Sequence, residues 1–463
     1  MLTSAASTAH AQIDPQSLFH EFSPALNDDA TALVAVSGGS DSTALLFLLK
    51  DYLEAVKSRA KLVAVTVDHA LREGSAAEAQ AVSQLCESHG IPHRTMIWRG
   101  AKPATGIAAA ARAARYGLLA EAASSFGASA IFTGHTADDQ AETVMMRQAR
   151  QAGRGLSGMA QATLLENRHW LLRPLLATRR ETLRDYLRNR NIAWFEDPTN
   201  QNDDYERPRM RQILRTSESD LQQKLHLASS AAQERHKLGQ AAAALIDRHI
   251  AKITPGLFRI DSDFLEETGS DAALYAVRLL LAVVGGKTYL PDEAKSRAVL
   301  AELGRSGFCA TLSRCVVEVR ATGIYVFREN RDLPAARTFK DGELWDERFR
   351  LHADEETGVS VAPAGETAAR KLAGKLAATP GSTGWRALSA EPALWREGAF
   401  LKLLPITSAH ESFGKEAFAT PILGPWAQFL PGFDFEPAAA LGKILHADAF
   451  LTPPLLGHKE SKA

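Results

Sequence analysis

The sequence has few cysteines and no long apolar segment. Its three cysteines, Cys86, Cys309 and Cys315, form no C-x-x-C pair. This argues against a disulfide framework, a zinc knuckle and an iron–sulfur cluster, and it fits a reducing compartment. The richest apolar run, Leu274 to Val284, is interrupted by Arg278 and falls short of the roughly 18 apolar residues of a membrane span. We therefore expect a cytoplasmic protein with no membrane partner.

Neither sign of charge is in excess over the whole chain. The 463 residues include 53 Lys and Arg and 54 Asp and Glu, a formal net charge of -1. Overall charge therefore points to neither a nucleic-acid nor a membrane partner. With 45% hydrophobic residues, the chain can fill the cores of about three domains at roughly 150 residues each. We expect domains at 1–217, 218–333 and 334–463, with Met1 to Ser23 as a loose arm.

Short apolar runs alternate with helical segments from Thr31 onward. The expected strands are Thr31–Val36, Lys61–Val67, His93–Trp98 and Ser129–Thr133, and the expected helices are Thr43–Leu49, Gly74–His89, Gly106–Ser125 and a segment from Ala137. This alternation predicts an α/β domain with a Rossmann-like parallel sheet covered on both faces. Ligands of such sheets bind at the carboxyl ends of the strands.

The sequence changes character beyond Arg215. Helical patterns dominate Leu221–Ile250 and Asp271–Leu303, and strand-like runs follow at Cys315–Val319 and Gly323–Phe327. We expect a mostly helical middle domain and, from Pro334, a smaller α+β domain.

The turn after the first expected strand reads Ser37-Gly38-Gly39-Ser40-Asp41-Ser42. Backbone N–H groups at a helix start bind anions, and two glycines allow a phosphate to approach closely. Asp41 would repel that phosphate unless a cation lay between them, so Mg²⁺–pyrophosphate is a suitable ligand. The turn has neither a Walker A nor a G-x-G-x-x-G pattern. The alternative is that Ser40, Asp41 or Ser42 only caps the helix.

Polar residues also follow the second and fourth expected strands. Asp68 and His69 come after the second, where the alternative is an Asp-capped turn. After the fourth come His135, Asp138, Asp139 and Glu142, and helical spacing puts the three acids on one face. Beside a phosphate loop these acids need cations, either Mg²⁺ or a substrate ammonium. The alternatives are a solvated acidic first turn and a histidine that only caps the strand end.

Arginine is concentrated in two places. Arg112 and Arg115 share one face of the Ala-rich helix and suit phosphate, unless that face is simply solvated. Between Arg147 and Arg215 there are fourteen arginines, no lysine and eight carboxylates, a net charge of +6. Aromatic residues such as Trp170, Trp194, Phe195 and Tyr205 are interleaved with them, as an RNA-binding surface requires. Helix-surface arginines without a ligand are the alternative.

These motifs together resemble a known family. Ser37 to Ser42 matches the S-G-G-x-D-S signature of the PP-loop ATP pyrophosphatases, which cleave ATP to AMP and pyrophosphate. The wider set resembles one branch, the tRNA(Ile)-lysidine synthases. Its motifs D-H-x-L-R, A-R-x-x-R-Y, G-H-x-x-D-D-Q-x-E-T, R-G-L-x-G-M, E-D-P-T-N and R-x-R-x-R begin at Asp68, Ala111, Gly134, Arg154, Glu196 and Arg207.

The resemblance implies an enzyme that adenylates the carbon-2 oxygen of the wobble cytidine in an isoleucine tRNA with a CAU anticodon. The amine of free L-lysine then displaces AMP. The fold it implies is the PP-loop, adenine nucleotide α-hydrolase-like fold, followed by tRNA-binding domains. Whether the chain forms a homodimer is left open. Two positions depart from the pattern: Thr136 stands where many members have a second histidine, and Pro208 interrupts the arginine motif.

The resemblance also implies roles for single residues. Asp41, His135, Asp139 and Glu142 would be catalytic, and Asp41 would bind the Mg²⁺ ion. ATP would be bound by the following residues: Ser37, Gly38, Gly39, Ser40, Asp41, Ser42, Asp68, His69 and Arg112. Lysine and tRNA would be bound by another set: Asp138, Asp139, Glu142, Arg115, Arg207, Arg209 and Arg211.

Three other functions fit less well. A PP-loop tRNA thiolase needs a sulfur carrier or cluster cysteines, whereas only Cys86 lies in the catalytic half. A non-catalytic nucleotide-binding RNA chaperone does not need three acids beside the phosphate loop. A glutamine-dependent amidotransferase needs a nucleophilic cysteine in a recognisable position, which the sequence lacks.

Overall fold

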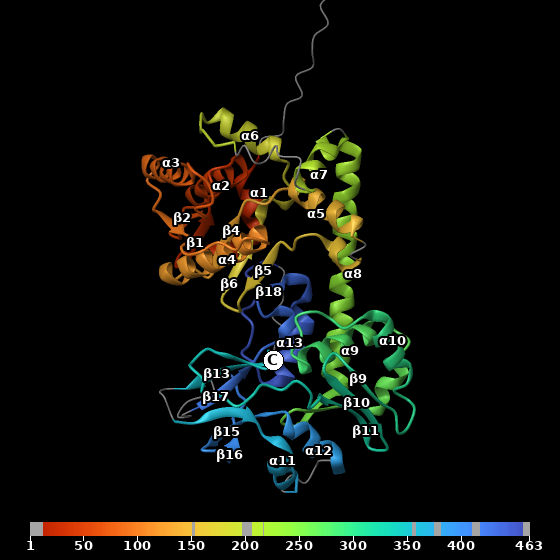
Figure 1. Cartoon of the computed structure of the whole chain (residues 1–463). Coiled ribbons are helices and arrows are strands. Elements are labelled where there is room, and N and C mark those ends of the chain that lie inside the picture. The colour runs from red at the N-terminus through yellow and green to blue at the C-terminus, as the bar shows by residue number, and fades with distance from the viewer. Residues whose placement is uncertain are drawn as a thin grey trace, which may run out of the picture. The chain divides into compact units, whose positions relative to one another are not determined.

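The computed structural model describes residues 13–150, 153–196, 206–215, 217–353, 358–374, 381–409 and 417–456. The chain forms two compact units, coloured along the sequence in Figure 1. The first contains Met1–Glu234 and Leu451–Ala463, and the second contains Arg235–Phe450. The division falls within the long helix α8 (Glu218–His249).

A mainly parallel sheet forms the centre of the first unit. Its strands are β1 (Thr31–Ala35), β2 (Lys61–Asp68), β3 (His93–Ile97), β4 (Ala130–Thr133), β5 (Ala162–Leu165) and β6 (His169–Leu172). They run in the order β5-β6-β4-β1-β2-β3, and only β5 is antiparallel to its neighbour. Ala35 at the end of β1 pairs with Val65 and Thr133. The turns after β1, β2 and β4 therefore lie together at the carboxyl ends of these strands. This is the point of the sheet where the chain places β2 on one side of β1 and β4 on the other.

Helices α2 (Ser40–Ala55), α3 (Ser75–Ser88) and α4 (Ile107–Phe126) pack on this sheet (Figure 1). Helix α5 (Ala137–Ala149) follows β4, α6 (Arg180–Asn189) packs on α2, and α7 (Glu206–Arg215) packs on α5. The four strands and four helices expected before residue 150 are all present, with ends shifted by a few residues. Apolar spacing located β1, β2, β4 and α2 because they are largely buried, whereas β3 has no fully buried residue. Strands β5 and β6 and helices α6 and α7 were not predicted.

The expected loose arm is wrong from Pro15 onward. Residues Pro15–Phe19 form α1, and His20–Leu26 form a 3-10 helix, η1. Phe19 and Phe22 are buried, and the ring centroid of each lies 6.4 Å from that of Phe132 on β4. These two aromatic side chains anchor the segment because their burial removes a large apolar area from water.

The second unit combines helices with three antiparallel sheets. Its five-stranded sheet has the order β7-β8-β11-β10-β9, and the smaller sheets have the orders β12-β13-β17 and β14-β15-β16. The strands of these sheets are β7 (Ile250–Thr254), β8 (Leu257–Ile260), β9 (Cys309–Leu312), β10 (Cys315–Arg320), β11 (Gly323–Arg328), β12 (Leu344–Trp345), β13 (Phe349–Ala353), β14 (Ser360–Pro363), β15 (Pro392–Arg396), β16 (Ala399–Leu403) and β17 (Ala417–Pro421). A further strand, β18 (Phe429–Pro431), belongs to none of these three sheets.

The helices of this unit, after α8, are α9 (Asp271–Val284), α10 (Glu293–Ala301), α11 (Gly365–Ala373), α12 (Gly381–Ser389) and α13 (Phe435–Leu445). The expected helical patches and both expected strands, now β10 and β11, are confirmed. Strands β7, β8 and β9 were not foreseen. Across the described ranges, no helix has the combination of length and apolar character that crossing a membrane requires.

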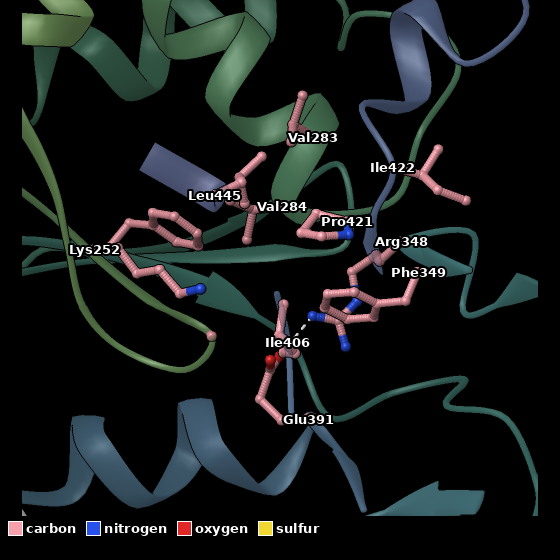
Figure 2. A pocket seen from close by; sticks show the side chains of 12 residues that line it. Lys252, Val283, Val284, Arg348, Phe349, Glu391, Ile406, Pro421, Ile422 and Leu445 are labelled. Carbon is pink, nitrogen blue, oxygen red and sulfur yellow. Dashed lines mark hydrogen bonds and ion pairs between the residues drawn. The ribbon is translucent and has the colours of Figure 1, made fainter. Parts of the chain in front are cut away.

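A buried network of ion pairs lies inside the second unit. Asp346 accepts hydrogen bonds from Arg328 at 3.1 Å and from Arg348 at 2.7 Å, and Arg348 also pairs with Glu391 at 2.7 Å. Figure 2 shows this last pair beside a cavity of about 20 Å³ into which Lys252 points. That space holds about one water molecule. Burial lowers the pKa of Lys252, although the nearby Glu391 acts in the opposite direction.

Candidate active site

The phosphate loop leaves the start of α2 open. Gly38 has φ +85°, a left-handed conformation that glycine adopts without strain. The N-cap residue is Gly39, and in this described segment no side chain caps the helix. Ser42 Oγ instead accepts from the Ser37 N–H at 3.1 Å, and Ser40 Oγ donates to Asp41 Oδ1 at 2.9 Å. The capping alternative is thus not seen, and the first N–H groups of α2 are free to bind an anion.

Two other segments approach this loop closely. A Cβ on Gly134, after β4, would lie 2.9 Å from backbone atoms of Asp41 and Ser42. Phe195 donates its N–H to the Gly38 carbonyl at 2.8 Å, and its ring would meet a Cβ on Gly38 at 3.0 Å. Gly134 and Gly38 are therefore required by close packing, because any side chain there would push these segments apart.

Thr136 has a structural role at the start of α5. Its hydroxyl accepts from the Asp139 N–H at 3.4 Å, and Asp139 Oδ2 accepts from the Thr136 N–H at 2.9 Å. This reciprocal arrangement is a capping box, which satisfies two N–H groups at the helix start. The departure at position 136 therefore places a helix-capping residue where an imidazole was expected.

Arg180, the first residue of α6, connects the acids of the site. Its Nε lies 2.7 Å from Asp41 Oδ2, its Nη2 2.9 Å from Asp139 Oδ1, and its Nη1 3.7 Å from Glu142 Oε1. Burial raises the pKa of Asp41 in spite of Arg180. Burial acts in the same direction on Asp139, but Arg180, Arg207 and the Thr136 N–H outweigh it and lower its pKa to about 2.

Glu142 is the most deeply buried acid of the group. It is 1% exposed and accepts from Arg211 Nε at 2.8 Å and from Arg207 Nε at 3.0 Å. Arg207 and Arg211 are one helical turn apart on α7, which packs against α5 through Ala141 and Leu214. Arg209, on another face of α7, is exposed and does not join this group.

Asp138 faces α6 instead. One of its oxygens accepts the Arg180 N–H at 2.8 Å, and the carboxylate pairs with Arg179 at 3.3 Å. Since α6 has no cap from its own residues, this carboxylate satisfies an N–H at its start and fixes the backbone from which Arg180 extends.

Positive charge surrounds His135. Burial lowers its pKa to about 3, and Arg173, Arg207 and Arg112 act in the same direction. The imidazole is therefore neutral near pH 7, and its Nδ1 lies 3.1 Å from Thr133 Oγ1. Arg112 packs over the Tyr116 ring at 4.9 Å, and neither it nor Arg115 pairs with a carboxylate within the described ranges. This side of the site has unbalanced positive charge that suits phosphate.

The turn after β2 holds a half-buried histidine. Asp68 Oδ1 accepts the Ala70 N–H at 2.8 Å, which closes the turn. The His69 ring lies 6.1 Å from the Trp98 ring, edge to face, and its buried Nδ1 has no partner among the described residues. Lys102 packs over Trp98 at 3.8 Å. Asp68 thus shapes the turn, whereas His69 retains a free polar atom beside an aromatic surface.

The acids of the site suit Mg²⁺ only as a partial ligand set. Asp41 and Asp139 supply carboxylate oxygens that meet on one guanidinium. Nowhere in the described part of the chain do three or more His, Cys, Asp or Glu side chains form a metal-binding group. Mg²⁺ is usually held by one or two carboxylates together with substrate phosphates, so these residues fit an ion that arrives with a nucleotide.

Several contributors were not singled out from the sequence. Arg180, Arg173, Trp98 and the contact of Phe195 with Gly38 are the main ones. A signal existed for Arg180, because a positive side chain at the start of a helix opposes the helix dipole and implies nearby acids. Of the motif that begins at Glu196, positions 197–200 lie outside the described residues, as does Tyr205.

Comparisons with known proteins agree with this geometry. A family model described as a PP-loop domain matches residues 8–217. A tRNA(Ile)-lysidine synthase from Mesorhizobium japonicum is 48% identical over 441 residues, covering 92% of this chain and 95% of its own length. Proteins of the same name from Brucella anthropi and Brucella melitensis are 36% and 37% identical, each covering 93% of this chain and 97% of its own length.

A solved structure was also compared. The U34-tRNA thiolase NcsA from Methanococcus maripaludis aligns with a TM-score of 0.41 and 15% identity, over 47% of this chain and 76% of that chain.

The first unit, with its open helix start after β1 and its matching family model, contains a PP-loop ATP-binding domain. Sequence identity of 48% and 36% to two named relatives, over nearly the full length of both chains, then shows which branch of the PP-loop proteins this is. The chain belongs to the tRNA(Ile)-lysidine synthase family.

Proposed function

We propose that this protein ligates L-lysine to carbon 2 of the wobble cytidine of an isoleucine tRNA with a CAU anticodon, using ATP. The observation that carries the proposal is the meeting of three groups at one sheet edge. They are the open start of α2, the acids Asp41, Asp139 and Glu142, and the arginines of α6 and α7. We assign the reaction to the cytoplasm.

In the first step the carbon-2 oxygen of cytidine attacks the α-phosphorus of ATP, and pyrophosphate leaves. The N–H groups of Ser40 and its neighbours would hold the departing pyrophosphate. Arg112 and Arg115 would neutralise the charge of other phosphate groups of ATP and tRNA. The rings of His69 and Trp98, which meet edge to face, would contact the adenosine. Asp41 and Asp139 would hold Mg²⁺, which when bound offsets the charge of the phosphates.

In the second step the neutral amine of lysine attacks carbon 2, and AMP leaves with the former carbonyl oxygen. Adenylation is needed because that oxygen is otherwise a poor leaving group. With pKa values of about 3 and about 2, His135 and Asp139 are weak bases. We infer that either takes the proton only after the new C–N bond has made the nitrogen acidic.

A cavity of about 130 Å³ beside the acids supports a lysine site. Carboxylates of Asp138, Glu142 and Glu181 line it, together with Leu214 and Leu221 and with four arginines, Arg179, Arg180, Arg184 and Arg211. The carboxylates suit the ammonium groups of lysine, the leucines its aliphatic chain and the guanidiniums its α-carboxylate. In this proposal Asp138, Asp139 and Glu142 bind lysine, while Arg207, Arg209, Arg211 and the domains at 218–333 and 334–463 bind tRNA.

The test is direct. The purified protein is incubated with ATP, Mg²⁺, labelled lysine and a transcript of the CAU isoleucine tRNA, and both label on RNA and AMP are measured. The same transcript with uridine at the wobble position is the control. Label on the cytidine transcript alone, with stoichiometric AMP, supports the proposal. AMP without transfer of lysine contradicts the assignment of the nucleophile, and no cleavage of ATP contradicts the whole proposal.

A further inference from the structure

We propose that Arg180 is a resident cation of the site, which Mg²⁺–nucleotide and lysine must both displace and which thereby couples their binding. This inference rests on the proposed function. It assigns a regulatory role to a residue whose three contacts reach both the nucleotide side and the lysine side.

The first observation is the position of the guanidinium. It bridges Asp41, which belongs to the phosphate loop, and Asp139, and it reaches Glu142, which lines the cavity proposed for lysine. The side chain of Arg180 is 14% exposed, so few other cations can approach these oxygens while it remains there.

The second observation is the charge balance. Three carboxylates, Asp41, Asp139 and Glu142, are matched by three guanidiniums, those of Arg180, Arg207 and Arg211. The carboxylates are thus already neutralised before any ligand binds. An added Mg²⁺ or ammonium ion gains full benefit from them only if a resident cation withdraws, because like charges at these distances repel.

The third observation concerns which cation can move. Arg207 and Arg211 belong to a helix held by the apolar contact of Leu214 with Ala141. Among the described residues, Arg207 pairs with Asp139 and Glu142 and Arg211 with Glu142, whereas Arg180 also pairs with Asp41 of the phosphate loop. Arg180 is therefore the cation whose withdrawal by a change of rotamer releases oxygens on the nucleotide side and the lysine side together.

Coupling follows from the sharing of one side chain. The first ligand to bind must displace Arg180, and part of its binding free energy is used for this. The second ligand then binds to carboxylates that Arg180 no longer contacts. Such a shared cost makes each ligand strengthen the binding of the other by the same factor, typically about 5- to 150-fold.

The experiment is calorimetric titration of lysine at pH 8, with and without Mg²⁺ and α,β-methylene-ATP, whose α–β linkage cannot be cleaved. In the wild type we expect the nucleotide to tighten lysine binding about tenfold. Arg180→Gln should bind lysine about tenfold more tightly without nucleotide, and the nucleotide effect should fall below about twofold. Arg190→Gln, at the end of the same helix and paired with Asp51 of α2, is the matched control and should behave as wild type.

The opposite results are equally clear. Weaker lysine binding by Arg180→Gln, or full retention of the nucleotide effect, overturns the inference. If Arg180→Gln does not fold, Arg180→Lys keeps the charge but loses the bridging geometry and should show a reduced nucleotide effect; an effect equal to that of the wild type overturns the inference. A wild type that ligates lysine yet shows no coupling refutes only the role of Arg180, whereas a wild type that binds no lysine refutes the proposed function as well.

Discussion

Each unit of the molecule contains a cluster of arginines and carboxylates, and the two clusters differ in their surroundings. In the second unit Arg328 and Asp346 are both 0% exposed and Arg348 is 5% exposed. In the first unit Arg207 is 42% and Asp41 18% exposed. Among the described residues, the first cluster also lies beside an open helix start and two arginines without carboxylate partners, Arg112 and Arg115, whereas the second lies beside a cavity with space for about one water.

The comparison shows that ion pairs alone do not mark a functional site. Both clusters satisfy their charges internally, as buried charges must. Among the described residues, the cluster of the first unit lies beside an uncapped helix start and arginines without carboxylate partners, and those are features a ligand can use. Mutations should therefore cost stability in the second cluster and activity in the first.

The largest effect on stability should come from Asp346→Ala. The change leaves Arg328 and Arg348 buried without their shared carboxylate, and it should lower the free energy of unfolding by about 3–5 kcal/mol. Urea denaturation measures this. Arg297→Ala, which breaks an exposed pair with Asp271, is the control and should cost less than about 1 kcal/mol. Equal losses in the two variants would erase the proposed distinction between buried and exposed pairs.

Asp41→Asn should have the largest effect on chemistry. It keeps the shape of the side chain but removes the charge proposed to hold Mg²⁺ beside the phosphates. Formation of AMP in the presence of tRNA should fall about a hundredfold to a thousandfold. The free energy of unfolding should change far less than in Asp346→Ala. Adenylation within about tenfold of the wild type would remove Asp41 from the proposed mechanism.

Glu142→Gln should separate the two steps. The amide fills the same space but binds an ammonium less well, so we expect KM for lysine to rise about tenfold or more while adenylation changes only a few-fold. Single-turnover measurements of AMP release and of lysine transfer distinguish the steps. Equal loss of both would contradict the division of labour between Asp41 and Glu142.

His135→Gln should produce the smallest effect, visible in the pH dependence of stability. In the unfolded chain a histidine gains a proton as pH falls through about 6.5, whereas folded His135 stays neutral until its pKa of about 3. Protons therefore favour the unfolded wild type below about pH 6.5, by up to about 2 kcal/mol at pH 5. Urea denaturation at pH 7.5 and pH 5 should show a loss about 2 kcal/mol larger in the wild type than in the variant, because buried histidines such as His69, His93 and His169 contribute to the loss in both. Parallel losses would mean that His135 titrates normally in the folded protein.

Local sequence was enough to predict the strands and helices between Thr31 and residue 150 and the polar turns that follow β1, β2 and β4. The strands before residue 150 are apolar and β-branched, and each is followed by a turn and a helical pattern, so period and length identify them. A parallel sheet brings the ends of such strands to one edge, which is why Ser37–Ser42 and the acids after β4 could be expected together. The seven motifs could be recognised in the sequence because each is a short run of neighbouring residues.

The remaining features of the fold and the site depend on contacts between residues that are distant in the sequence, so only the tertiary structure decided them. Helices α1 and η1 are held by Phe19 and Phe22 against Phe132, and the contact cannot be read from the sequence because Phe132 is more than a hundred residues away. The partners of Glu142 lie more than sixty residues away on α7, and Arg180 reaches Asp41 across a separation of 139 residues. The sequence by itself determined which chemical groups the protein carries and which strand ends present them. Which arginine neutralises which acid follows only from packing, because ion pairing has no periodic pattern along a chain.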